Sequence, residues 1–78
     1  MIRLENIVID KHIIKCDIFP EDSTEKGALQ MDVRTMEFAA TLPRGYEWCK
    51  NHIEHAKRSL LKIYETTEIP PCKTIMWN

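Results

Sequence analysis

The sequence predicts an α+β fold in which one amphipathic helix packs on one face of an antiparallel β-sheet. Two observations lead to this prediction. Apolar and polar residues alternate, as they do in strands, through much of residues 2–42. After residue 45 the apolar spacing becomes helical, and a short strand-like segment follows it. The predicted order is therefore a four-strand meander, a helix and a C-terminal strand.

Length and composition predict a single domain over residues 1–78. A chain of 78 residues buries only about 60% of the surface that its unfolded form exposes, so it supports one modest core. Its composition is 44% hydrophobic and 29% charged, which is typical of a globular protein rather than a disordered one. The net charge of -1 provides no overall field that would attract nucleic acid or an anionic membrane.

Apolar runs and cysteine usage predict a cytoplasmic protein. The apolar runs are far shorter than the roughly 20 residues that span a bilayer, and the first residues lack the apolar core of a signal peptide. Three cysteines, Cys16, Cys49 and Cys72, are an odd number without close pairing. Small secreted proteins have even numbers of cysteines in disulfides, so we expect reduced thiols here.

The third and fourth predicted strands form a hairpin. Leu29, Met31 and Val33 share one face of "GALQMDVR", and "MEFAATL" repeats the alternation. A turn at Arg34 and Thr35 brings apolar residues into register on one side of the sheet. The predicted pairs are Val33 with Met36, Met31 with Phe38, and Leu29 with Ala40.

The first two predicted strands, "IRLENIVI" and "HIIKCDIF", carry apolar residues on both faces. A register with Val8 opposite His12 sets Glu5 against Lys15 and Arg3 against Asp17, so that opposite charges meet across the strands. Val8 then points inward with the core residues. The same register leaves three apolar side chains on the outer face: Ile7, Ile13 and Phe19. We expect them to be covered by a homodimer partner or another protein.

The second half of the chain begins with a helix. A polar loop is predicted at residues 20–27, and an apolar stripe at helical spacing follows later, formed by Cys49, Ile53, Ala56, Leu60 and Ile63. The helix is expected to end near Thr66, because the prolines of "EIPP" prevent its continuation. A last strand at residues 73–77 places Ile75 and Trp77 on its buried side.

The stretch "WCKNHIEHAKRSL" contains the candidate metal ligands Cys49, His52 and His55. Thiolate and imidazole suit zinc, and residues three apart are neighbours on a helix. Cys49 and His55 are nevertheless separated by about 120° around the helix axis, so a site needs a further ligand from Cys16, Cys72 or His12. The preferred interpretation is a buried structural cysteine bordered by two histidines. We therefore expect no metal ion and no cofactor.

No catalytic group is predicted. The inward-facing Cys49 lacks the exposed, electropositive setting of a nucleophile, and neither a calcium loop nor a glycine-rich phosphate loop is present. The helix carries basic residues at Lys50, Lys57, Arg58 and Lys62, but Glu47, Glu54 and Glu65 interrupt them, as on an ordinary solvent-facing helix. Glu54 and Arg58 are spaced for an ion pair. We expect no direct binding of nucleic acid.

Several segments resemble the HicB-type antitoxin core: a strand meander, "LPRGYEW", a helix ending in "AKRSLLKIY", and the tail "EIPPCKTIMW". The segment "KCDIFPE" at residues 15–21 and the pair His55-Ala56 also resemble small bacterial and phage proteins. The likeness to HicB implies a degenerate ribonuclease-H-like fold without activity that masks a toxin partner. Four strands are predicted before the helix here, where that family has three.

The sequence therefore favours a small, soluble, non-enzymatic domain that acts as a homo-oligomer, such as a homodimer, or as a protein-interaction module. Two alternatives remain open. One is a HicB-like antitoxin that masks a toxin, and the other is a metal-binding protein that uses the cysteine and histidines of the helix.

Overall fold

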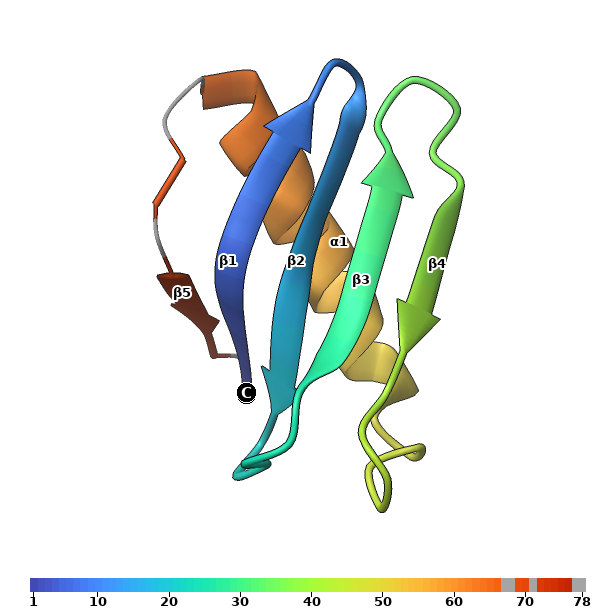
Figure 1. Cartoon of the computed structure of the whole chain (residues 1–78), viewed down its shortest axis with the longest axis vertical. Helices are drawn as coiled ribbons and strands as arrows, with labels where there is room; N and C mark the ends of the chain where they lie inside the picture. Colours follow the sequence, from blue (N-terminus) through green and yellow to red (C-terminus); the bar gives the residue numbers. More distant parts are fainter. Residues whose placement is uncertain (67–68, 71, 77–78) are drawn as a thin grey trace.

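The computed structural model describes residues 1–66, 69–70 and 72–76 and shows the α+β architecture that the sequence predicts. Four strands precede the helix and one follows it: β1 (Ile2–Asp10), β2 (Ile13–Pro20), β3 (Gly27–Asp32), β4 (Phe38–Thr41), α1 (Lys50–Thr66) and β5 (Cys72–Ile75). The sheet order is β4-β3-β2-β1-β5, and all neighbouring strands are antiparallel (Figure 1). The edges of the sheet are therefore β4 and β5.

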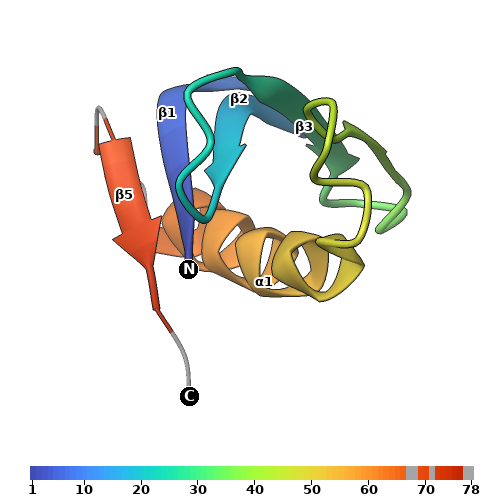
Figure 2. The same ribbon diagram turned by 90° about the horizontal axis from the view of Figure 1, so that it is seen from below.

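The helix and the sheet form two layers with one core between them. Figure 2 shows α1 lying under one face of the curved sheet, and Figure 1 shows that it crosses behind the sheet obliquely, from the lower end of β4 towards the upper end of β1. The helix residues of the predicted stripe, Ile53, Ala56, Leu60 and Ile63, are all buried. They meet a layer of sheet residues that consists of Ile2, Leu4, Ile7, Ile14, Cys16, Ile18, Leu29 and Met31.

A β-bulge in β1 makes the predicted register of the first hairpin wrong. Glu5 pairs with Asp17, but Val8 pairs with Lys15, so two residues of β1 face one residue of β2 in between. Asn6 occupies this bulge with a φ of 54°, a conformation that asparagine tolerates better than most residues. The extra residue reverses the alternation. Ile7 is therefore buried in the core, and Val8 is 46% exposed on the other face.

The observed register brings the like charges of Glu5 and Asp17 opposite one another instead of the predicted opposite charges. Neighbouring donors offset this arrangement. Arg3 Nε lies 2.6 Å from Glu5 Oε2, and Asn6 Nδ2 donates to Asp17 Oδ2 at 2.8 Å. Lys26 Nζ lies 3.9 Å from the same Asp17 oxygen. Asn6 therefore has two roles: it forms the bulge, and it donates a hydrogen bond to Asp17, which faces the like charge of Glu5.

The β3–β4 hairpin keeps the predicted register, but its turn is longer than predicted. Met31 pairs with Phe38 and Leu29 with Ala40, as expected. Val33 and Met36 do not pair, because both lie in the loop between the strands. Asp32 explains the wider turn, since its Oδ1 accepts hydrogen bonds from the backbone N–H groups of Arg34 and Thr35.

Gly27 allows the end of β4 to approach β3 closely. A Cβ atom at this position would clash with the backbone carbonyl oxygen of Thr41, so only glycine fits here without displacing β4.

The ends of α1 agree in part with the prediction. The helix ends at Thr66 as expected, whereas Cys49 precedes its first residue and is buried nonetheless. Ile75 is partly buried against the core, and the predicted position of Trp77 lies outside the described residues. Within the described chain, no helix is both long enough and apolar enough to cross a membrane.

Candidate functional site

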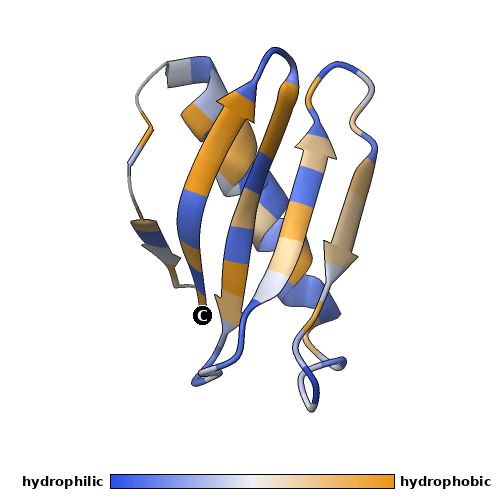
Figure 3. Ribbon diagram, in the orientation of Figure 1, coloured by the Kyte–Doolittle hydropathy of each residue, from blue (hydrophilic) through white to orange (hydrophobic). Residues whose placement is uncertain are grey.

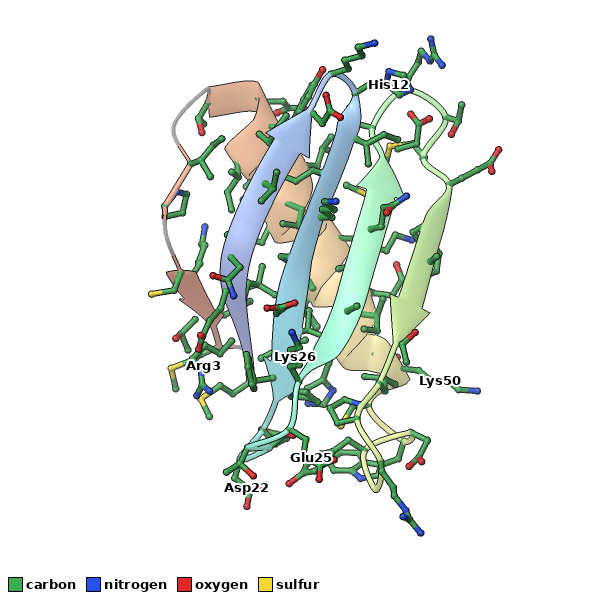
Figure 4. All side chains as sticks on the ribbon, in the orientation of Figure 1. Arg3, His12, Asp22, Glu25, Lys26 and Lys50 are labelled. Carbon is green, nitrogen blue, oxygen red and sulfur yellow. The ribbon has the colours of Figure 1, made fainter. Side chains whose placement is uncertain are left out.

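The structure separates the Cys49, His52 and His55 triplet. Cys49 is fully buried, His52 is 7% exposed, and His55 lies towards β5 beside Arg58 and Ser59. His12, one of the candidates for a further ligand, lies at the β1–β2 turn. This turn is at the opposite end of the sheet from Lys50, the first residue of α1 (Figure 4). Among the residues that the structure describes, no group of three or more His, Cys, Asp or Glu side chains is placed to hold a metal ion.

His52 belongs to a polar network that joins the start of α1 to the loop after β2. Its Nε2 lies 3.2 Å from Glu21 Oε1, and the other carboxylate oxygen of Glu21 lies 3.2 Å from the N-terminal amine of Met1. The hydrogen bond from His52, followed by that from the N-terminus, lowers the pKa of Glu21 below its ordinary value of 4.5. The sequence placed His52 at the border of the core, and only the fold reveals Glu21 as its neighbour.

Aromatic residues cover this network on its outer side. The Trp48 ring packs edge-on against His52 at 5.7 Å between centroids and stacks on Tyr46 at 6.4 Å. Tyr46 donates its hydroxyl to Asp22 Oδ1 at 2.6 Å, which raises the pKa of Tyr46. These contacts fasten the loop between β4 and α1 to the loop between β2 and β3, so their role is structural.

The three free cysteines occupy unreactive or isolated positions. Burial, assisted by the charge of Asp17, raises the pKa of the Cys16 thiol to about 12, and burial also raises the pKa of Cys49. Thiolate character is therefore suppressed at both core positions. Cys72 lies exposed on the edge strand β5.

The β4 edge is the least protected part of the sheet. All four residues of β4, "FAAT", are exposed, and none carries a charge. In Figure 3, β4 shows only apolar to near-neutral colours, whereas strongly hydrophilic bands interrupt β1, β2 and β3. Natural edge strands are usually protected by charged side chains, prolines or bulges, and β4 contains none of these.

An apolar groove runs along the helix side of β4. It has a volume of about 370 Å³ and is lined by Phe38, Ala40, Leu42, Lys50, Ile53 and Glu54. Phe38 is 47% exposed, although the Lys57 ammonium lies 3.7 Å from its ring centroid. The groove exists because α1 packs mainly on β1, β2 and β5. The face of β4 that should join the core is consequently only partly covered.

The outer face of the sheet differs from the predicted apolar patch. Of the three predicted interface residues, Ile7 is in the core, so its outward placement is wrong. Phe19 is half-buried, with the Arg3 guanidinium 4.6 Å above its ring. Ile13 is half-buried and lines a shallow hollow with Gln30 and Ala39. Charged and amide groups therefore interrupt the apolar side chains on this face, and Val8, rather than Ile7, is the exposed apolar residue that β1 contributes to it.

The basic residues of α1 divide into two groups. Lys50 and Lys57 lie towards β4, where Lys57 Nζ is 3.5 Å from Glu54 Oε2, so that Glu54 pairs with Lys57 rather than with Arg58. Arg58 and Lys62 face the other edge of the sheet and lie beside Lys73 of β5. The sequence could not identify Lys73 as part of this group, because only the pairing of β5 with β1 brings it next to the helix.

Comparisons with protein families, with curated proteins and with solved structures find no match to this chain.

Proposed function

We propose that this domain is a non-enzymatic self-association module in which β4 pairs with β4 of a second copy. The single observation that carries the proposal is an uncharged edge strand whose four residues are all exposed, with its first residue, Phe38, lining an apolar groove. Such an edge presents unpaired backbone groups to any incoming strand. A reducing, cytoplasmic setting belongs to the same proposal, because the three cysteines are free.

The ladder between β3 and β4 indicates which backbone groups are available. Asp32 donates its N–H to the carbonyl of Glu37, and this pair continues the register in which Gln30 faces Ala39. Hydrogen-bonded pairs alternate along an antiparallel ladder, so the N–H and C=O groups of Phe38 and Ala40 point away from β3. These groups are the ones to which a second strand would bind.

A two-fold axis through this edge satisfies the sterics of an antiparallel pair. An axis at Ala39 sets Ala39 opposite itself and Phe38 opposite Ala40, whereas an axis at Ala40 sets Ala39 opposite Thr41. Small side chains lie at the centre in either case, so the side chains there would not block the approach of a second strand. The resulting sheet would be continuous through both copies.

The groove adds side-chain contacts to this backbone pairing. Four residues provide few inter-strand hydrogen bonds, and each is worth only about 1 kcal/mol net. Apolar contacts must therefore contribute, and Phe38 and Leu42 provide them beside the axis. Lys50 and Glu54 line the same groove, so a two-fold related copy can bring opposite charges together across the interface.

The test is the solution mass of the full chain and of a charged edge variant. Light scattering at micromolar concentration, with reducing agent, should give about twice the 9.2 kDa mass of one chain. Ala39→Lys places a charge at the centre of the β4 edge and should return the mass to that of a monomer. Ala40→Pro should do the same, because proline removes a donor that points away from β3.

Cys72→Lys is the matched control, because it adds the same charge to the other edge strand, where it faces Glu5. It should leave the mass of the dimer unchanged. A monomeric wild-type chain, or equal effects of Ala39→Lys and Cys72→Lys, would contradict the proposal. If the wild-type chain is monomeric and a co-purified protein dissociates on Ala39→Lys, the HicB-like role with a toxin on this edge replaces self-association.

A further inference from the structure

A surface hollow lies between the second half of α1 and strand β5, at the edge of the sheet away from β4. It has a volume of about 370 Å³ and is lined by His55, Arg58, Ser59, Lys62, Lys73, Thr74, Ile75 and Met76. Pockets for small organic ligands range from about 300 to 1,000 Å³. The hollow is therefore large enough for a small molecule, and the interaction proposed above does not use it.

The described side chains that line this hollow carry charge of one sign. Arg58, Lys62 and Lys73 contribute three cations, and none of the described lining residues is Asp or Glu. Ion pairs elsewhere in the described chain involve Arg3, Lys26 and Lys57, whereas none of these three cations pairs with a described carboxylate. Three cations that are drawn together without a counter-charge repel one another, and a bound anion relieves this repulsion.

Ser59 provides a second, independent observation. It is only 7% exposed, and its hydroxyl has no hydrogen-bond partner among the described residues. A buried hydroxyl without a partner costs about 1 to 3 kcal/mol, and helical serines commonly avoid that cost by bonding to a carbonyl one turn earlier. Ser59 instead lines the basic hollow with its donor unused.

We propose that this hollow binds the phosphate group of a small phosphate monoester. Arg58 binds phosphate oxygens through its planar fork of N–H donors, while Lys62 and Lys73 supply further charge. Ser59 donates its hydroxyl to one of these oxygens. Ile75 and Met76 form an apolar wall beside the cations, which suits an organic substituent on the phosphate better than a free ion.

The test is titration of the isotopically labelled full chain, followed by amide chemical shifts. The probes are phenyl phosphate, inorganic phosphate and, as a neutral analogue, phenol. Phenyl phosphate should shift the amides of residues 55–62 and 73–76 and bind at least about fivefold more tightly than inorganic phosphate, because the ring contacts the apolar wall. Equal affinities would assign the site to free phosphate, and no saturable shift with either anion would overturn the proposal.

Two double variants distinguish a specific phosphate site from a nonspecific effect of charge. Arg58→Gln with Lys62→Gln should weaken phenyl phosphate binding more than tenfold, because two charged contacts are lost. Lys11→Gln with Arg44→Gln changes the net charge equally but lies outside the hollow, and it should leave the affinity within about twofold of wild type. Equal losses in the two double variants would show a nonspecific charge effect and would contradict the site.

Ser59→Ala separates the two roles of the hydroxyl most clearly. Removing an unpartnered buried hydroxyl should leave the melting temperature unchanged or raise it. If the hydroxyl donates to the phosphate, the same change should weaken phenyl phosphate binding about tenfold. An unchanged affinity, or a fall in melting temperature that parallels the loss of binding, would exclude Ser59 from the site.

Discussion

The two edges of the sheet are protected to different degrees, although both are strands of four residues. β5 carries Lys73 and lies beside Arg58 and Lys62 of α1, so an incoming strand would meet positive charge there. β4 carries no charge and adjoins an apolar groove. Charge therefore protects one edge of the sheet, while the other edge is left open to a partner.

The bulge in β1 follows the segment that pairs with β5, and a substitution beside it gives the largest expected effect. Among the described residues, β5 pairs with Ile2–Glu5 of β1, and the bulge residue Asn6 comes next. Ile7→Asp places an unpaired charge in the core and should lower the free energy of unfolding by about 3 kcal/mol or more. Val8→Asp, one residue later, should change it by no more than about 0.5 kcal/mol. Urea denaturation measures both values, and a larger cost at Val8 would disprove the bulge.

Gly27→Ala tests how closely β4 must approach the rest of the sheet. The added methyl group meets the Thr41 carbonyl, so we expect the free energy of unfolding to fall by about 2 kcal/mol. Gly45→Ala is the control. Gly45 has a φ of 89° with open space around it, so the cost there is only that of the backbone conformation, about 1 kcal/mol. The same urea series compares them, and equal costs would show that β4 adapts to the extra methyl.

Protonation of Glu21 makes the stability of the fold depend on pH. Neither edge strand contains an acidic residue that could do the same. The pKa of Glu21 is lowered in the folded chain, so its stabilising effect is complete above its ordinary pKa of 4.5 and is lost as pH falls through the folded value. The melting temperature of the wild-type chain should therefore fall more steeply below about pH 4.5 than that of Glu21→Gln. Parallel curves would show that the bond to His52 does not contribute. Because Glu21 is exposed, we expect a smaller effect than for the two core variants.

Substitution of Lys57 should have the smallest effect on stability. It tests whether the exposure of Phe38 controls association at the β4 edge. The Lys57 ammonium covers part of the Phe38 ring and pairs with Glu54. Lys57→Gln should lower the free energy of unfolding by less than about 1 kcal/mol. It should also strengthen self-association by exposing more of Phe38, which sedimentation at several concentrations would detect. Weaker association would mean that Lys57 itself belongs to the interface.

The sequence predicted the parts of the fold that depend on regular periodicity. The helical stripe from Ile53 to Ile63 and the pairing of Met31 with Phe38 are both confirmed, because each depends on an uninterrupted alternation of apolar residues. The register of β1 was predicted wrongly because one asparagine with positive φ reverses the alternation after Glu5. Nothing in the local pattern of "LENIV" distinguishes a bulge from a regular strand with apolar residues on both faces.

The candidate sites depended on long-range contacts, which a pattern of spacings does not contain. The triplet of Cys49, His52 and His55 suggested a shared ligand, yet the partner that His52 has is Glu21, from a loop that the sequence treats as solvent-exposed. Lys73 joins Arg58 and Lys62 only through the return of the chain as β5. The exposure of β4 depends on the oblique path of the helix across the sheet (Figure 1).

The bulge at Asn6 also has a consequence for how the chain folds. Sliding β1 along β2 by one residue would break the hydrogen bond between Asn6 and Asp17. The same shift would turn Ile7 out of the core. Misaligned forms of this hairpin are therefore poor competitors during folding. The β3–β4 hairpin lacks such a device, and in refolding experiments we expect it to align later than β1 and β2.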